Sequence, residues 1–180
     1  SNVEVIENFR WNETSMVDSL LCARDLLLKG ITLVSYGDII YTKETALNLA
    51  NYDKQLVIAY DPYWLKLWSL RFDDPISDAE TFKINSEGII TEIGQLPRSL
   101  DEIEGQYMGL LRFTPAAIRV VERVLVEARF KIKDMTSLLQ AIIKSNSMNI
   151  YGVPSSGPWC EIDQPKDLLI AKEIAKIIDS

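Results

Sequence analysis

Two short acidic motifs, far apart in the chain, hold the residues most suited to chemistry. The first ends in Asp38, which follows Gly37 and the apolar stretch 31–35. The second contains Glu161 and Asp163, whose period-two spacing places both side chains on the same side of a strand. Mg²⁺ is usually held by one or two carboxylates together with substrate phosphates. If Asp38 and Asp163 end neighbouring strands of one sheet, the sequence predicts a magnesium site there.

Each motif also has a purely structural interpretation. Asp38 would close a turn or cap the helix that follows it. Asp163 lies where a strand is expected to become a helix, so it is a suitable N-cap for the closing helix. A carboxylate oxygen that accepts a hydrogen bond from the backbone is less free to bind an ion. The sequence leaves both interpretations open at each aspartate.

The composition narrows the chemistry that the chain can perform. The 180 residues include no histidine, which excludes a Ser-His-Asp triad, a Cys-His pair and an HExxH zinc site. The net charge of -7 argues against a broad nucleic-acid footprint, which needs a basic face. Cys22 and Cys160 are too few for a disulfide framework, so a cytoplasmic location is expected, with Cys160 as a buried structural thiol. No apolar run approaches the roughly 18 residues of a membrane span.

The first third of the chain predicts the elements that would position Asp38. The expected elements are strands at 3–7, 31–35 and 56–60, a helix at 14–29 capped by Thr14 or Ser15, and a helix at 43–50 capped by Thr42. This alternation is typical of a parallel sheet with covering helices. The stretch 31–35 has the composition of a strand that is buried on both faces of such a sheet.

The rest of the chain has a mixed order of elements. The expected elements are an aromatic helix or loop at 63–68, a hairpin of strands 81–84 and 89–93, strands at 106–113, 149–154 and 159–162, and helices at 115–129, 135–144 and 163–178. Gly88 is expected to have a positive φ in the hairpin, and Gly109 indicates a close approach of the backbone. We therefore predict a single α/β domain over 1–180, with three layers and a parallel sheet that carries antiparallel additions.

Aromatic and acidic side chains offer a site for a cationic group. Asp78 and Glu80 share a strand-like face and would suit an ammonium group, although a solvated edge or a salt bridge explains them equally well. Asp134 either caps the helix after it or contacts an accepting substrate. An aromatic cage, which binds quaternary ammonium by cation–π attraction, would draw on Trp11, Tyr63, Trp64, Trp68, Tyr107 and Trp159. Trp64, Trp68, Tyr107 and Trp159 are alternatively core residues.

Five segments occur in the order that is typical of one enzyme family. They are NETSMVDSL at 12–20, YGDI at 36–39, PISDAE at 75–80, EGQYMGL at 104–110 and WCEID at 159–163. Over 3–175 the chain resembles nucleotidyltransferases of the sugar-nucleotide and phosphocholine cytidylyltransferase type, most closely the branch found with phosphonate biosynthesis. The resemblance implies a Rossmann-like, GT-A-like sheet and Mg²⁺, with Asp38 and Asp163 as metal ligands. Together with the groups above, it suggests as substrate-binding residues Ser15, Tyr63, Trp64, Asp78, Glu80, Glu104, Gly109, Asp134, Trp159 and Glu161.

The resemblance also implies a reaction. Such enzymes use a phosphomonoester to attack the α-phosphate of a nucleoside triphosphate, release pyrophosphate and form a nucleoside diphosphate-linked product. The expected donor is CTP, and the expected acceptor is a small phosphorylated alcohol or a phosphonate, such as phosphocholine or 2-aminoethylphosphonate. A homo-oligomer is compatible with the sequence, whereas nucleic acid and membrane are not expected as partners.

One family feature has no match in this chain. The family begins with a strand and a glycine-rich loop of the form Leu-Ala-Ala-Gly-x-Gly-x-Arg, followed by Pro-Lys, which wraps the triphosphate. The stretch 3–7 resembles a later strand. We therefore expect a domain that is partial at its N-terminus and inactive alone. The alternatives are a shortened, non-catalytic homologue that serves binding or assembly, and a sugar-1-phosphate nucleotidyltransferase.

Overall fold

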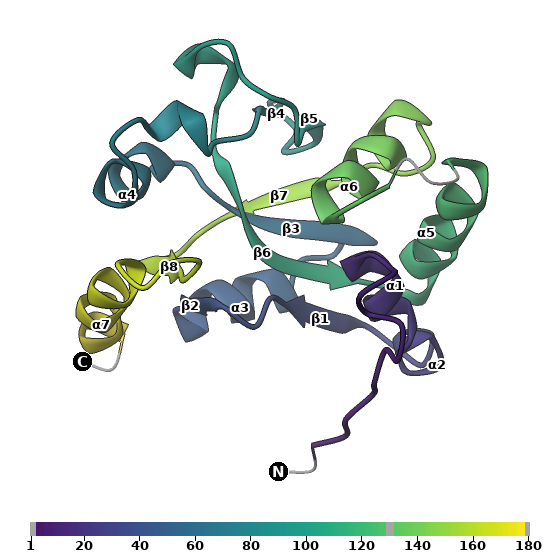
Figure 1. Cartoon of the computed structure of the whole chain (residues 1–180). Helices are drawn as coiled ribbons and strands as arrows, with labels where there is room; N and C mark the ends of the chain where they lie inside the picture. Colours follow the sequence, from purple (N-terminus) through teal and green to yellow (C-terminus); the bar gives the residue numbers. More distant parts are fainter. Residues whose placement is uncertain (1–2, 129–131, 179–180) are drawn as a thin grey trace.

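A four-stranded mixed sheet forms the centre of the molecule (Figure 1). The computed structural model describes residues 3–128 and 132–178. The strands lie in the order β1 (Thr32–Ser35), β6 (Gln106–Phe113), β3 (Leu56–Asp61) and β7 (Tyr151–Pro154). β6 is antiparallel to both β1 and β3, whereas β3 is parallel to β7. Three strands therefore share a direction and β6 runs against them, as expected for a parallel sheet with an antiparallel addition.

The position of β1 differs from its prediction. This strand lies at one end of the described sheet and pairs antiparallel with β6. Its residues alternate between half-buried and exposed, because Val34 packs on the core while Leu33 is turned away from it. The expectation of a strand buried on both faces is therefore wrong for this stretch. That environment belongs to β3, five of whose six residues are buried.

Side chains of β3 contribute to a hydrophobic core on each face of the sheet. Leu56 and Ile58 belong to one core, and Val57 and Ala59 belong to the other. This follows from the period of two along a strand. Because both faces of the central strand must be covered, the sheet lies between two layers of helices. The predicted three-layer architecture is confirmed.

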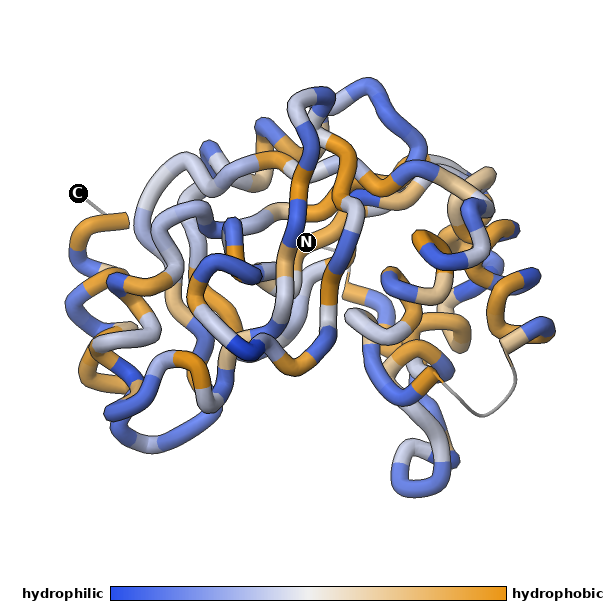
Figure 2. The backbone as a smooth tube through the Cα atoms, turned by 90° about the horizontal axis from the view of Figure 1, so that it is seen from above, coloured by the Kyte–Doolittle hydropathy of each residue, from blue (hydrophilic) through white to orange (hydrophobic). Residues whose placement is uncertain are grey.

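The helices divide between the two faces (Figure 1). The first core receives α1 (Met16–Leu21), α2 (Arg24–Leu27), α5 (Pro115–Ala128) and α6 (Met135–Lys144). The second core receives α3 (Lys43–Ala50), α4 (Trp64–Arg71) and α7 (Asp167–Ile178). Along the helices, hydrophobic and hydrophilic residues alternate in short groups, as expected for helices with one face on a core (Figure 2). None of the described helices is long and apolar enough to cross a bilayer.

Two small antiparallel pairs of strands lie outside the four-stranded sheet. β2 (Ile39–Tyr41) pairs with β8 (Trp159–Glu161), and β4 (Phe82–Ile84) pairs with β5 (Ile90–Ile93). The second pair is the predicted hairpin, and its turn contains Gly88 with φ of 75°. Two short 3₁₀ helices, Pro75–Ser77 and Leu100–Glu102, lie in the loops on either side of the hairpin.

Helix boundaries follow the capping residues. Ser15, Thr42 and Asp134 each accept a hydrogen bond from the backbone of the helix that follows, as predicted. The predicted helix 14–29 is instead two helices, because the chain turns at Cys22 and Ala23 between α1 and α2. The predicted strand at 3–7 is absent, and these residues are exposed. The predicted end of the helix at 129 lies outside the described residues.

The backbone of β6 is irregular beside Gly109. Its pairing with β3 changes register between the pairs Ile58–Leu111 and Tyr60–Tyr107. Gly109 has φ of 75°, and a Cβ atom added there would lie 2.7 Å from Cδ2 of Tyr36. Glycine is needed here for two reasons, the positive φ and the space for the ring. The predicted close approach at Gly109 is confirmed.

We expect Gly109→Ala to lower the free energy of unfolding by about 1–3 kcal/mol, since alanine is strained at this φ and its methyl group meets the Tyr36 ring. Urea denaturation followed by circular dichroism would measure the change. Gly30→Ala is the matched control, because an added Cβ at Gly30 meets nothing within 4 Å. Equal stability of the two variants would contradict this account of Gly109.

Candidate active site

The fold brings the two acidic motifs together at the β2–β8 pair. Ile39 lies opposite Glu161 in the antiparallel register. The N–H of Ile162 donates a hydrogen bond of 2.9 Å to the carbonyl oxygen of Asp38. Asp38 therefore lies beside the segment that contains Glu161 and Asp163. The two motifs meet on a short antiparallel ribbon, whereas the sequence suggested the ends of neighbouring strands in the main sheet.

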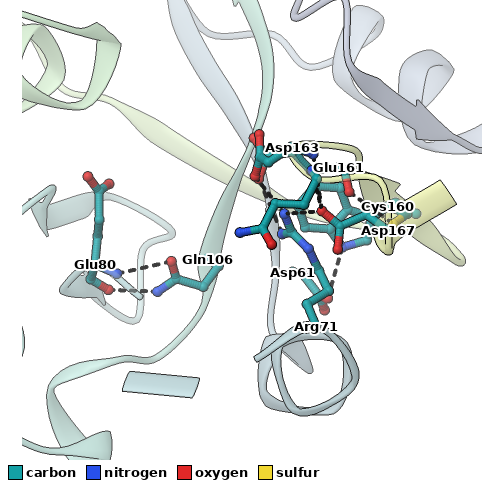
Figure 3. A network of polar contacts seen from close by, with 10 residues as sticks. Asp61, Arg71, Glu80, Gln106, Cys160, Glu161, Asp163 and Asp167 are labelled. Atoms are coloured by element: carbon teal, nitrogen blue, oxygen red, sulfur yellow. Dashed lines mark hydrogen bonds and ion pairs between the residues drawn. The ribbon is translucent and has the colours of Figure 1, made fainter. Parts of the chain in front are cut away.

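A buried arginine lies at the centre of the second motif (Figure 3). Arg71 is the last residue of α4, and its side chain is 0% exposed. Its Nη2 lies 2.6 Å from Oδ2 of Asp163 and 3.5 Å from Oδ2 of Asp167, while its Nη1 lies 3.3 Å from Oε2 of Glu161. The guanidinium also lies over the rings of Trp68 and Phe72. One cation thus contacts three carboxylates, all of which come from the C-terminal segment.

Asp167, the first residue of the closing helix, binds the backbone of the turn that contains Asp163. Its Oδ2 accepts hydrogen bonds from the N–H groups of Asp163 and Gln164, at 3.1 and 3.0 Å. The closing helix therefore begins at Asp167, four residues later than predicted, and Asp163 lies in the turn before it. Burial alone would raise the pKa of Asp167, but the N–H of Gln164 and the Arg71 guanidinium hold it below its usual value.

Negative charge exceeds positive charge around Arg71. Burial and the charge of Asp163 raise the pKa of Glu161 to about 7, although Arg71 acts in the opposite direction and Asp38 adds to the rise. Burial is also the main cause of a raised pKa at Asp78, where Asp163 adds to it and Arg71 opposes it. Cys160 is buried, and burial raises its thiol pKa to about 11, in keeping with the predicted structural role. Carboxylates that remain hard to ionise next to one cation favour binding of a second cation.

A second acidic group lies at Glu80, on the other side of two tyrosines. The backbone of Glu80 is fixed by the side chain of Gln106, which accepts from its N–H at 3.2 Å and donates to its carbonyl oxygen at 2.6 Å (Figure 3). The Glu80 carboxylate accepts a hydrogen bond of 3.2 Å from Thr136. Burial raises the pKa of Glu80, and the charge of Asp134 adds to this effect.

Tyr36 and Tyr107 lie between the two acidic groups. Their rings meet edge to face, with centroids 5.9 Å apart. Burial raises the pKa of Tyr36, and the charges of Asp134, Glu161 and Glu80 raise it further. The Tyr107 hydroxyl is buried, and its contact with Tyr36 opposes the rise in the pKa of Tyr36.

The six aromatic residues of the predicted cage do not come together as an open site. Trp64, Trp68 and Trp159 are each at most 4% exposed and pack on one another, so they are core residues. Trp11 and Tyr63 are exposed, and Tyr107 is half-buried against the first core. Tyr63 and Trp159 do line a pocket of about 440 Å³ between α4 and α7, together with Asp61, to which the Trp159 indole donates.

The remaining predicted residues are held by local contacts. Ser15 forms a capping box with Asp18 and lines a pocket of about 710 Å³ with Arg10 and Glu13. The neighbouring Met16 accepts a hydrogen bond of 3.3 Å from the Tyr36 hydroxyl, so this helix start lies near the tyrosine pair. Glu104 accepts from the N–H of Ile84 and is therefore tied to the hairpin.

Arg71 and Asp167 were missed by the sequence reasoning, although Arg71 carried a signal. It ends a mainly aromatic and apolar helix, and an arginine that is buried with such a helix needs carboxylate partners. In the described part of the chain, no group of three or more Asp, Glu, Cys or His side chains is arranged to hold a metal ion. A cation bound here would therefore depend on two carboxylates and on oxygens of a substrate.

Comparison with solved structures identifies the fold. None of the established family profiles matches the chain. Its fold is shared with the inositol-1-phosphate CTP transferase from T. maritima (TM-score 0.67, 20% identity, 95% of this chain and 65% of that one). It is also shared with a putative glucose-1-phosphate thymidylyltransferase from Bacillus anthracis (TM-score 0.66, 14% identity, 91% of this chain and 61% of that one). The chain thus spans less than two thirds of the length of both solved structures.

A curated relative defines the family more closely. The CTP:phosphoglutamine cytidylyltransferase of Campylobacter jejuni is 37% identical in an alignment 180 residues long that covers 92% of this chain and 70% of that protein. The chain therefore belongs to the nucleotidyltransferase family that includes this cytidylyltransferase, and the predicted resemblance is confirmed.

Proposed function

We propose that the protein transfers a cytidylyl group from CTP to a small phosphorylated acceptor. The observation that supports this most directly is the meeting of Asp38 with the segment of Glu161 and Asp163, in a chain that is 37% identical to a cytidylyltransferase. In the reaction, an oxygen of the acceptor phosphate forms a bond to the α-phosphorus of CTP. The bond to the β-phosphate breaks, and pyrophosphate leaves with the electron pair.

The proposal assigns a divalent cation, Mg²⁺, to Asp38 and Asp163. Both are oxygen donors, they come from adjacent segments, and the Asp163 side chain is 45% exposed while its partner Arg71 is enclosed. The surplus of carboxylates over cations at this place fits a hard cation. When bound, such an ion would neutralise charge on the triphosphate. The chain's own contribution is to hold these two carboxylates in position and to orient the acceptor.

The acceptor is proposed to carry an ammonium group. Glu80 is half-buried, and within 3–128 and 132–178 no cationic side chain forms an ion pair with it or with Asp134. An unpaired carboxylate in such a place is stabilised when a ligand brings a positive charge. The Campylobacter relative is named for phosphoglutamine, and phosphocholine and 2-aminoethylphosphonate also carry a cationic nitrogen. A sugar 1-phosphate carries none, so Glu80 favours the ammonium acceptors.

Asp38→Asn and Asp163→Asn are each expected to lower kcat for pyrophosphate release by about a hundredfold or more, since each removes a charged ligand of the proposed cation. The assay uses the protein of the whole reading frame with CTP, Mg²⁺ and phosphocholine or phosphoglutamine. Glu87→Gln is the control, because Glu87 is an exposed carboxylate in the β4–β5 turn. Wild-type rates in both aspartate variants would refute the assignment of the two residues.

Glu80→Gln should raise KM for an ammonium acceptor roughly tenfold and leave KM for CTP unchanged, since a charge-assisted contact is lost. Because burial raises the pKa of Glu80, its ionised form costs stability at neutral pH, and this cost falls as the pH falls. The glutamine variant should therefore melt at the same temperature or higher at pH 7. An equal rise in KM for glucose 1-phosphate and for phosphocholine would argue against an ammonium subsite.

We further propose that the 180 residues alone do not turn over CTP, since their sequence has no match to the glycine-rich triphosphate loop. Calorimetric titration with each nucleoside triphosphate and Mg²⁺ tests whether the 180 residues bind nucleotide. We expect CTP to bind to the whole-frame protein and not to the 180-residue chain. If the whole-frame protein binds no triphosphate, the enzyme proposal fails and a binding or assembly module is favoured.

A further inference from the structure

Both terminal nitrogens of the Arg71 guanidinium are held by carboxylates, whereas its buried Nε has no hydrogen-bond partner among the described residues. The Arg71 side chain has no exposed surface, and its guanidinium lies between three carboxylates and the rings of Trp68 and Phe72. The carbonyl oxygen of Arg71 also accepts a hydrogen bond from Lys166, which follows Asp163 closely in the chain. A buried guanidinium is costly unless its partners are well placed, so each contact restricts the others.

These contacts hold Asp163 at two points. Arg71 binds its side chain through Oδ2, and Asp167 accepts from its backbone N–H. Asp167 is itself bound to Arg71, so a single guanidinium supports both points. Among the described residues, no donor forms a hydrogen bond with Oδ1 of Asp163. One oxygen is therefore engaged and the other is available.

We propose that Arg71 is a positioning residue that presents the free oxygen of Asp163 to the divalent cation. This inference rests on the proposed function, in which Asp163 is a metal ligand. Carboxylates that bind metals are commonly oriented by a hydrogen-bond partner of this kind, and loss of the partner lowers metal affinity by roughly ten- to a hundredfold.

The opposite role would be that of a competitor, since Arg71 is itself a cation beside the site. A competitor and a positioning residue differ in the sign of the effect. Removal of a competing charge tightens cation binding, because Asp38 and Asp163 then bind the added cation without a neighbouring positive charge that repels it. Removal of a positioning residue weakens cation binding, because the carboxylates repel one another and Asp163 can turn away.

An Mn²⁺ titration of the whole-frame protein without substrate decides between a positioning residue and a competitor. The electron paramagnetic resonance signal of free Mn²⁺ reports how much of the ion is bound. Arg71→Met and Arg71→Lys are expected to raise the dissociation constant roughly ten- to a hundredfold. The lysine variant keeps the charge but cannot bind Glu161 and Asp163 with separate nitrogens. If the Arg71 variants do not fold, Asp167→Asn tests the contact between Asp167 and the backbone N–H of Asp163. This variant should also raise the dissociation constant for Mn²⁺.

Arg112→Met is the matched control. Arg112 is also buried, at 5% exposure, but its guanidinium donates to the carbonyl oxygens of Ala50 and Lys54. Its loss should lower stability without a change in Mn²⁺ affinity. Unchanged or tighter Mn²⁺ binding in the Arg71 variants, or full affinity in the lysine variant, would overturn the positioning role alone. No Mn²⁺ binding by the wild-type protein would overturn the proposed metal site together with this inference.

Discussion

The burial of one guanidinium among carboxylates is the interaction on which the candidate site depends. Arg71 ends a helix of the second core, and its partners belong to the turn before the closing helix. Without this cation, Asp167 would be a buried carboxylate with the like charge of Asp163 close to it. The same ion pairs therefore fix the end of α4, the start of α7 and the orientation of the second acidic motif.

The hydrophobic cores supply the rigid frame for this polar arrangement. Trp64, Trp68 and Trp159 pack on one another beside the second motif, and the indole of Trp159 donates to Asp61 at the end of the central strand. Gly109 allows Tyr36 to lie against β6 and close to Tyr107. Packed aromatic rings therefore fix the backbone from which these carboxylates extend.

Local patterns predicted most of the elements but not the way in which they assemble. The hairpin at Gly88, the caps at Ser15, Thr42 and Asp134, and the close approach at Gly109 depend on neighbouring residues, and all were predicted. The edge position of β1 and the break between α1 and α2 depend on contacts with distant residues, which composition does not reveal. The sequence left Asp163 open between a helix cap and a metal ligand, and it did not show that Arg71, 92 residues earlier, binds the Asp163 side chain.

The strand order also bears on how the protein folds. β1 pairs with β6, and β3 pairs with β7, so each ladder of the main sheet joins segments that lie far apart in the chain. The ribbon of β2 and β8 joins segments that are still further apart. Chains dominated by such distant pairings fold slowly, because long loops must close before the contacts that stabilise them can form. The meeting of the two acidic motifs therefore requires the closure of a longer loop than any pairing in the main sheet.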